Sequence, residues 1–230
     1  MISKQNREIL VEFFSQKYEK EINNKMMYYD YVFPKEEMIG YINNINNVPI
    51  EEFIKYIFFD NKDISIKAKD VMQFSNIEDA STRLCRELKY NGNNGVKNIE
   101  VGKLLLIDGK DRNDGAYIKY GENHAKTAEM LGLVCEFTHT YFVSSMGYII
   151  DEIDEISRKK LLERLILRSK LIRQLICATK KGNVSVRAFL YMLSDSTYIR
   201  RRSNIKTILR ILKESSEYDF SLILDKIIFY

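Results

Sequence analysis

The apolar residues of this chain recur mostly three or four positions apart, which is the spacing of one face of an α-helix. The pattern predicts helices throughout residues 1–60. A proline suits the first turn of a helix because the N–H that it lacks is not needed there, so Pro34 and Pro49 are each expected to begin one. The asparagine-rich residues 43–49 are expected to form the loop between these two helices.

The middle of the chain is less regular. Residues 76–90 place apolar side chains on one helical face, whereas the glycine- and asparagine-rich residues 91–95 break the pattern and suggest a domain boundary. The apolar run at residues 101–107 is compatible with either a helix or a strand.

A long helix is predicted at residues 114–131, with Gly132 placed to end it in a left-handed conformation. Residues 134–142 then alternate between apolar and polar around a small polar tip, which predicts a β-hairpin. A helix followed directly by a hairpin is the order of a winged helix, in which the hairpin is the wing.

The last third of the chain has a second pattern that is typical of DNA-binding proteins. Residues 150–180 have a helical, basic pattern, and residues 184–193 also suggest a helix. After a short polar break, Ser196 is expected to cap a helix that extends to Leu212. Helix, short break and basic helix together form the outline of a helix-turn-helix. The tail at residues 218–230 alternates weakly and suggests a hairpin or strand.

Composition and charge narrow the range of functions that the protein could have. The net charge is +4, and between Arg158 and Lys213 the chain has 16 Lys and Arg against 2 Asp and Glu, an excess that indicates a polyanionic partner. No apolar run of about 18 residues is present, so no membrane span is expected. The three widely spaced cysteines and the absence of a signal-peptide pattern favour a reducing cytoplasm.

Most of the residues expected to touch DNA lie on the outward faces of the two long predicted helices and at the hairpin tip, and Lys206 lies at the border of the apolar face. In the first unit they are Lys119, Asn123, Lys126 and His139, and in the second they are Arg200, Arg202, Ser203, Lys206, Thr207 and Arg210. Arg201 falls near the apolar face and is expected to extend past it or to pair with an acid.

Several short motifs occur together between residues 96 and 215: Lys119-Tyr120-Gly121-Glu122-Asn123-His124, Lys126-Thr127-Ala128, Leu131-Gly132-Leu133, Tyr141-Phe142, Ser144-Ser145, Gly147, Leu193-Ser194, Ser196-Thr197, Arg200-Arg201-Arg202, Ile205 and Ile208-Leu209. In combination they resemble a helical winged-helix module that accompanies restriction endonucleases and related DNA-modification systems. The resemblance implies sequence-specific recognition of duplex DNA on behalf of a nuclease.

A nuclease centre would need two acids to hold Mg²⁺ and a nearby lysine to stabilise the transition state. Two tripeptides of the acid-x-Lys form are candidates. Glu87 and Lys89 could act with Asp79 or Asp70, and Asp108 and Lys110 follow an apolar run. Such tripeptides arise by chance in a chain with 30% charged residues, and the sequence around Glu87 is helical, so no catalytic residue is assigned.

The sequence therefore predicts a mainly α protein with small β-hairpins, in which tandem winged-helix or helix-turn-helix units follow a helical N-terminal region. The expected domains are a helical domain at 1–95, a winged-helix unit at 96–150 and a basic helical unit at 151–230. The expected function is sequence-specific binding of double-stranded DNA as the recognition component of restriction–modification. A nuclease subunit or a second copy of the chain is the expected protein partner, and no cofactor is expected.

Two alternatives stay open at this point. One is a compact Mg²⁺-dependent type II restriction endonuclease that recognises and cleaves DNA by itself. The other is a scaffold whose basic face contacts an acidic protein.

Overall fold

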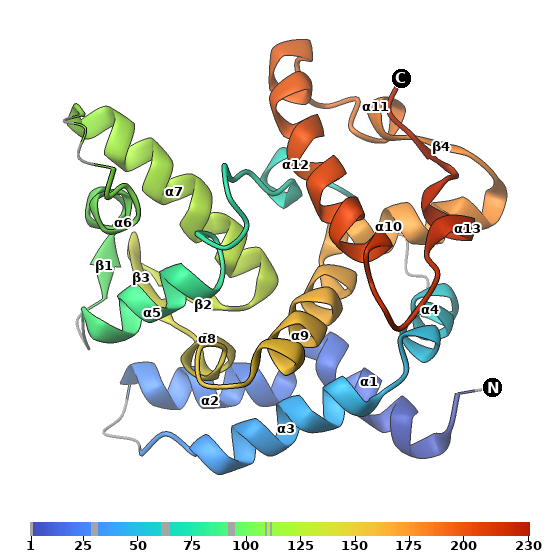
Figure 1. The fold of residues 1–230 in the computed structure, drawn as a ribbon, viewed down its shortest axis with the longest axis horizontal. Coiled ribbons are helices and arrows are strands. Elements are labelled where there is room, and N and C mark those ends of the chain that lie inside the picture. Colours follow the sequence, from blue (N-terminus) through green and yellow to red (C-terminus); the bar gives the residue numbers. More distant parts are fainter. Residues whose placement is uncertain (1, 29–31, 61–64, 92–94, 109, 111) are drawn as a thin grey trace. The chain divides into compact units, whose positions relative to one another are not determined.

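The structure of the chain is a computed structural model that describes residues 2–28, 32–60, 65–91, 95–108, 110 and 112–230. The fold is mainly helical, as predicted, and its strands form small sheets (Figure 1). Two compact units make up the chain. Unit 1 comprises residues 1–14, 44–72 and 159–230, and unit 2 comprises residues 15–43 and 73–158. Each unit is thus assembled from separated stretches, whereas the sequence predicted three consecutive domains.

Unit 2 contains the predicted helix and hairpin. Its helices and strands are α2 (Lys17–Tyr28), α3 (Lys35–Asn47, which continues into unit 1), α5 (Thr82–Tyr90), β1 (Val96–Lys97), α6 (Asn98–Leu105), α7 (Asp114–Leu131), β2 (Val134–Phe137), β3 (Thr140–Val143) and α8 (Ser145–Ile149).

The sheet of unit 2 is antiparallel, with β3 between β1 and β2. Val96 pairs with Tyr141 at one edge and Cys135 pairs with Phe142 at the other. Thr138 and His139 form the turn with φ values of 49° and 61°, so the predicted hairpin is confirmed. Gly132 ends α7 with a φ of 79°, which confirms the predicted left-handed end of the helix.

Unit 1 contains the basic part of the chain. Its elements are α1 (Lys4–Ser15), α4 (Ile50–Phe59), the 3₁₀ helix η1 (Ala68–Asp70), α9 (Glu155–Arg168, whose first turn belongs to unit 2), α10 (Lys170–Ala178), the 3₁₀ helix η2 (Thr179–Lys181), β4 (Val184–Ser185), α11 (Val186–Phe189), α12 (Asp195–Lys213), α13 (Ser221–Leu224) and β5 (Ile227–Ile228). Within it, α10 packs against α4, and β4 pairs with β5 in parallel.

The predicted loop at residues 43–49 is wrong for its first part, because α3 continues to Asn47. Asparagine is a poor helix former, but Ile42, Ile45 and Val48 are all buried here, so packing outweighs propensity. A side chain from another helix stabilises the end of α3. The guanidinium of the buried Arg164 donates hydrogen bonds of 2.8–3.1 Å to the backbone carbonyls of Ile45, Asn46 and Val48.

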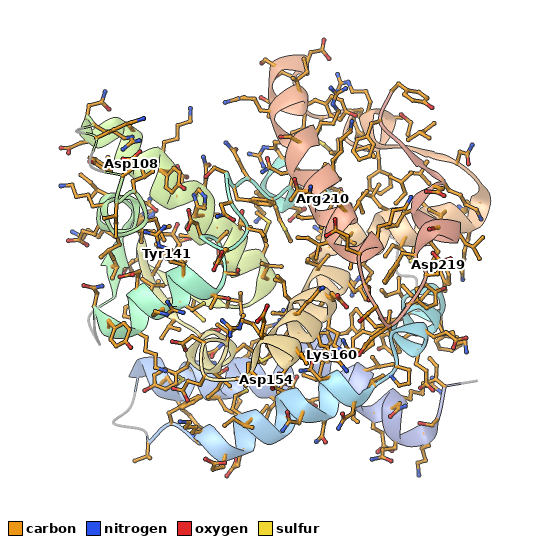
Figure 2. The ribbon with its side chains drawn as sticks, in the orientation of Figure 1. Asp108, Tyr141, Asp154, Lys160, Arg210 and Asp219 are labelled. Atoms are coloured by element: carbon orange, nitrogen blue, oxygen red, sulfur yellow. The ribbon has the colours of Figure 1, made fainter. Side chains whose placement is uncertain are left out.

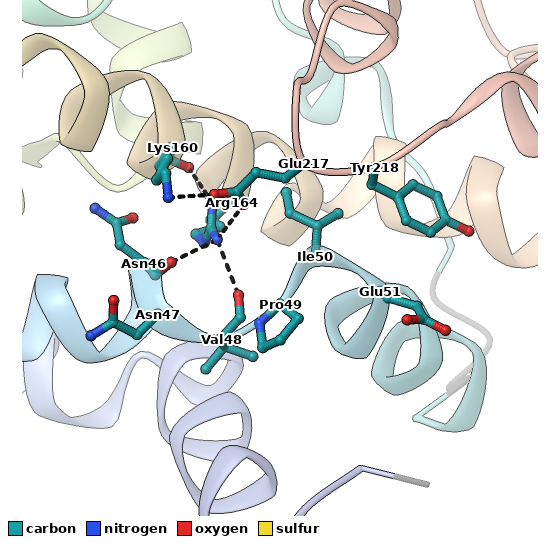
Figure 3. Close-up of a pocket in the computed structure, with 10 residues that line it drawn as sticks. All are labelled: Asn46, Asn47, Val48, Pro49, Ile50, Glu51, Lys160, Arg164, Glu217 and Tyr218. Carbon is teal, nitrogen blue, oxygen red and sulfur yellow. Dashed lines mark hydrogen bonds and ion pairs between the residues drawn. The ribbon is translucent and has the colours of Figure 1, made fainter.

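Arg164 also forms an ion pair of 2.8 Å with Glu217, and Lys160 reaches the other oxygen of the same carboxylate at 2.5 Å. Figure 3 shows these groups along one side of a shallow cavity of about 440 Å³. The guanidinium has five N–H donors, and they are shared between carbonyl groups and this carboxylate. The buried charge is therefore paired, and its role here is structural.

Other predictions need local correction. The helix expected at residues 76–90 begins only at Thr82. Of the two alternatives left open for residues 101–107, the structure has the helix, which ends at Leu105. Residues 184–193 contain the short strand β4 and a single helical turn instead of a full helix. The tail forms α13 and then β5, which pairs with β4 and not with a neighbouring strand of its own. Pro34 and Pro49 do precede helices, each immediately before the first helical residue.

Candidate nucleic-acid interface

Helix α12 is fixed to unit 1 by one face. Its buried residues are Tyr198, Asn204, Ile205, Ile208, Leu209 and Leu212, the apolar stripe that the sequence predicted together with two flanking positions. The cap is Ser194 and not Ser196 as predicted: the Ser194 hydroxyl accepts a hydrogen bond from the Thr197 N–H. Because the helix starts earlier than expected, Arg200 lies in its second turn.

The opposite face of α12 is polar and open to solvent. Arg200, Ser203, Lys206 and Arg210 are exposed, and Arg202 and Thr207 are half-buried, so all six predicted DNA-binding residues of this helix have solvent access. Figure 2 shows Arg210 on this helix. The Ser203 hydroxyl donates to the Arg200 carbonyl at 2.9 Å, and the Thr207 hydroxyl donates to the Ser203 carbonyl at 3.1 Å.

The cations on this face differ in how far they are neutralised. Arg210 lies 3.8 Å from Glu214, and Lys213 forms a 2.9 Å ion pair with Asp225. In the part of the chain that the structure describes, Arg200, Arg202 and Lys206 have no carboxylate within 4.0 Å. Lys206 instead lies 5.1 Å above the ring of Phe229. Three positive charges therefore face outward without an acidic partner, which favours a polyanionic ligand.

Among the residues that the structure describes, no acid pairs with Arg201. Its guanidinium donates to the backbone carbonyl of Ala68 at 3.0 Å and to that of Val71. Burial lowers the pKa of Arg201, and the neighbouring Arg200 lowers it further. Arg201 thus holds the η1 segment against α12 and is not part of the outward face.

Helix α7 has a weaker basic face. Lys119 and Lys126 are exposed and Asn123 is half-buried, as expected for an outward stripe. Lys126 forms a 2.7 Å ion pair with Glu122 one turn earlier, which partly neutralises the stripe. His139 at the hairpin tip is 95% exposed, and its Nδ1 lies 3.5 Å from the Glu136 carboxylate.

The inward side of α7 is held by hydrogen bonds to the segment that precedes α5. The Thr127 hydroxyl accepts from the Gln73 N–H and donates to the Gln73 carbonyl, at 3.1 and 2.9 Å. The buried His124 uses Nε2 to accept from the Ser75 N–H at 3.2 Å, and its Nδ1 lies 2.8 Å from the Tyr120 carbonyl. These contacts fix the rotation of α7 about its own axis.

A repeat that the sequence reasoning missed relates the two long helices. The order helix, short strand, helix, capped long helix occurs as α5-β1-α6-α7 and again as α10-β4-α11-α12, with the 3₁₀ helix η2 inserted after α10 in the second set. Asp114, Tyr117, Ile118, Lys119 and Asn123 align without a gap with Asp195, Tyr198, Ile199, Arg200 and Asn204. Both isoleucines are exposed, at 42% and 61%. The shared Asp-x-x-Tyr-Ile-basic pattern was the available signal for this repeat.

The first set of acid-x-Lys candidates is engaged in separate contacts. Asp79 is buried, where it accepts hydrogen bonds of 2.9 Å from Arg83 and from the Tyr120 hydroxyl. Lys89 points toward Asp151 and Glu152 of the α8 end and also donates to the Tyr148 carbonyl at 3.2 Å. Glu87 lies on the helix α5, the element that suits a catalytic acid of this type least. The predicted trio does not converge.

The second set is also engaged. Both oxygens of Asp108 accept hydrogen bonds of 2.5 Å from Arg112, which lowers the pKa of this carboxyl far below its usual range. Asp108 also accepts from the Lys110 N–H, so Lys110 contributes its backbone rather than its ammonium. Among the described residues, no three His, Cys, Asp or Glu side chains form a group that could hold a metal ion.

Comparison with protein-family models, curated proteins and solved structures found no match. The described helices include none that is long and apolar enough to cross a membrane. The interpretation of this interface therefore depends on the contacts, exposure and charge of α7 and α12 themselves.

Proposed function

We propose that this protein binds double-stranded DNA, with α12 as the principal recognition helix and α7 as the second. The observation that carries the proposal is the outward face of α12, where Arg200, Arg202 and Lys206 have no acidic partner within the described part of the chain. A helix anchored by one face and lined with arginine, lysine, serine and threonine on the other suits the major groove, where it can meet base edges and phosphates.

The order of elements in unit 2 supports the assignment. Helix α5, strand β1, helices α6 and α7 and the hairpin β2–β3 follow one another, and β1 pairs with β3. This is the order of a winged helix, with α7 in the place of the recognition helix and His139 at the tip of the wing. The second set shares the first four elements, but its strand β4 pairs in parallel with β5, so it has no wing.

We extend the proposal to a role as the recognition component of a restriction–modification system, on the strength of the resemblance in residues 96–215. A nuclease subunit or a second copy of the chain is then the expected protein partner. The geometry does not favour the self-contained nuclease, because Asp79, Lys89 and Asp108 are each engaged by other side chains.

The test is a salt titration of duplex binding. If about six phosphates are contacted, log affinity falls against log salt with a slope near −5. A triple variant, Arg200→Ala/Arg202→Ala/Lys206→Ala, is expected to lose most of this affinity. The matched control removes the same charge from the ion-paired Lys25, Lys35 and Lys55 and is expected to bind almost as the parent does. A flat salt response, or equal losses in both variants, would contradict the proposal.

Incubation of plasmid DNA with Mg²⁺ separates recognition from cleavage. The protein alone is expected to leave the plasmid intact. Site-specific fragments that disappear in a Glu87→Ala or an Asp108→Ala variant would instead establish the nuclease alternative.

A further inference from the structure

We infer that the segment Lys67–Asp70, which contains η1, is a second DNA-contacting element beside α12, and that Lys67 and Lys69 bind backbone phosphates. This inference rests on the proposed function and adds to unit 1 a contact that lies more than a hundred residues from α12 along the sequence.

Two independent contacts attach the segment to the basic region. Arg201 of α12 donates to the carbonyls of Ala68 and Val71, which bracket η1. Lys170, at the first position of α10, forms a 2.8 Å ion pair with Asp70. The arginine in the middle of the Arg200–Arg202 run therefore holds this segment through two backbone carbonyls.

Asp70 is the single acid of the segment, and neighbouring groups already bind its carboxylate. The Asp70 carboxylate accepts a 2.7 Å hydrogen bond from the Lys67 N–H and pairs with Lys170. Burial opposes ionisation of this carboxyl, but these two contacts outweigh it and lower the pKa of Asp70. Asp70 therefore stays ionised, and its negative charge is balanced chiefly by the ion pair with Lys170, with a smaller electrostatic contribution from Lys69.

Lys67 and Lys69 are exposed, and within the described residues neither has a carboxylate at ion-pair distance. They alternate along the segment with Ala68, whose carbonyl is the one that Arg201 holds. The backbone that carries these two exposed lysines is therefore held beside α12 by Arg201. Lys206 lies toward the other edge of the exposed face, over Phe229.

Phosphate is the ligand chemistry that fits this arrangement. A flexible lysine acts as a point charge without preferred base geometry, and cations beside a groove-binding helix meet the sugar–phosphate backbone rather than base edges. The segment should consequently add affinity and salt dependence without adding sequence preference.

The experiment compares Lys67→Ala/Lys69→Ala with Lys17→Ala/Lys20→Ala, which removes two exposed lysines from α2. Each protein is titrated with a preferred duplex and with a randomised duplex over a range of salt. For the first variant we expect weaker binding to both duplexes alike and a salt slope shallower by about 2, close to 0.9 for each lost phosphate contact. The control should retain the parent slope, and thermal melting should show that both variants fold.

The outcomes separate the two proposals. If the parent does not bind duplex DNA, the proposed function fails, and this inference fails with it. If the parent binds with a steep slope and Lys67→Ala/Lys69→Ala is unchanged, only this inference is overturned. An equal loss in the α2 control, or a changed base preference in the first variant, also overturns it.

Discussion

At the scale of single residues, the close approach of α6 and α7 depends on glycine. A Cβ on Gly121 would lie 1.9 Å from the Asn98 carbonyl oxygen, and a Cβ on Gly102 would lie 2.0 Å from that of Tyr117. Both obstacles are backbone atoms, which cannot rotate away. We expect Gly121→Ala to reduce the free energy of unfolding by about 1–3 kcal/mol or more, because the two helices must separate. Denaturant titration measures this loss.

Gly115 on the same helix is the matched control. Its Cβ would meet only the Asn113 side-chain oxygen, at 3.4 Å, and the position is exposed. Since alanine is the better helix former, Gly115→Ala should be neutral or stabilising by up to about 1 kcal/mol. If both variants lost the same stability, close packing at Gly121 would not be the cause.

The buried His124 should make the free energy of unfolding depend on pH. Burial lowers its pKa from the usual value of 6.5. The folded state therefore binds a proton less readily than the unfolded state does. The stabilisation of the folded state by the neutral His124 is complete above about pH 6.5. It is lost as the pH falls from that value through the lowered pKa of the folded state. His124→Gln should flatten the fall in unfolding free energy between about pH 7 and pH 5, measured by denaturation at each pH.

The exposed His139 is the natural control for this experiment, since the chain has two histidines. His139→Gln should keep the slope of the parent protein. A parent-like slope in His124→Gln would show that other groups produce the acid sensitivity.

The residue types expected on the outward faces could be read from the sequence, but their partners could not. Helical spacing correctly placed Arg200, Ser203 and Arg210 on the exposed side of α12. Spacing could not show that Arg201 would hold carbonyls of Ala68 and Val71, because that contact depends on a segment far away in the chain. The same limit applies to Asp79, whose partner Tyr120 lies on another helix.

At the scale of elements, substitutions at two positions of α12 should impair DNA binding in two different ways. Arg200 lies in its second turn, close enough to the N-terminal end to reach base edges, and an arginine there can bind guanine through two hydrogen bonds worth about 1–3 kcal/mol of discrimination. Arg200→Ala should lower specific affinity and relax the preference at one base pair. Competition against a randomised duplex library measures both.

Lys206 should behave differently, because it lies at the edge of the exposed face, over Phe229. Lys206→Ala should weaken binding to all sequences alike and make the salt slope shallower by about one. If Arg200→Ala kept full preference and affinity, α12 would not be the base-reading helix.

Strong local signals made some elements predictable. The α7 helix and the β2–β3 hairpin have their own cap, a glycine at the helix end and a tight turn, so local sequence determines them. The end of α3 and the strand β4 were missed for the opposite reason. The first depends on Arg164 and the second on pairing with β5, and neither partner is near in sequence.

At the scale of the whole molecule, the two units interleave along the chain, which limits where it can be cut. Residues 151–230 include most of unit 1 but lack α1, α4 and the η1 segment. In the intact chain Arg168 donates to the Phe13 carbonyl at 3.2 Å and lies 4.4 Å from the Phe13 ring, and Arg164 caps α3. A fragment 151–230 would keep both cations and lose these partners.

We therefore expect the fragments 151–230 and 96–150 not to fold cooperatively, although their ends match the domain boundaries suggested by sequence. The fragment 151–230 would expose the apolar surface that packs against α4 and would lose the carbonyl partners of Arg164 and Arg168, a loss of several kcal/mol that is comparable to the whole stability of a small domain. The fragment 96–150 in turn lacks α5 and the segment at residues 73–79 that holds α7. Thermal melting followed by circular dichroism should give a sharp transition for residues 1–230 and broad, weak transitions for both fragments. A sharp transition in fragment 151–230 would show that the basic region is an independent domain, and the contacts of Arg164 and Arg168 with the first 50 residues would then be dispensable.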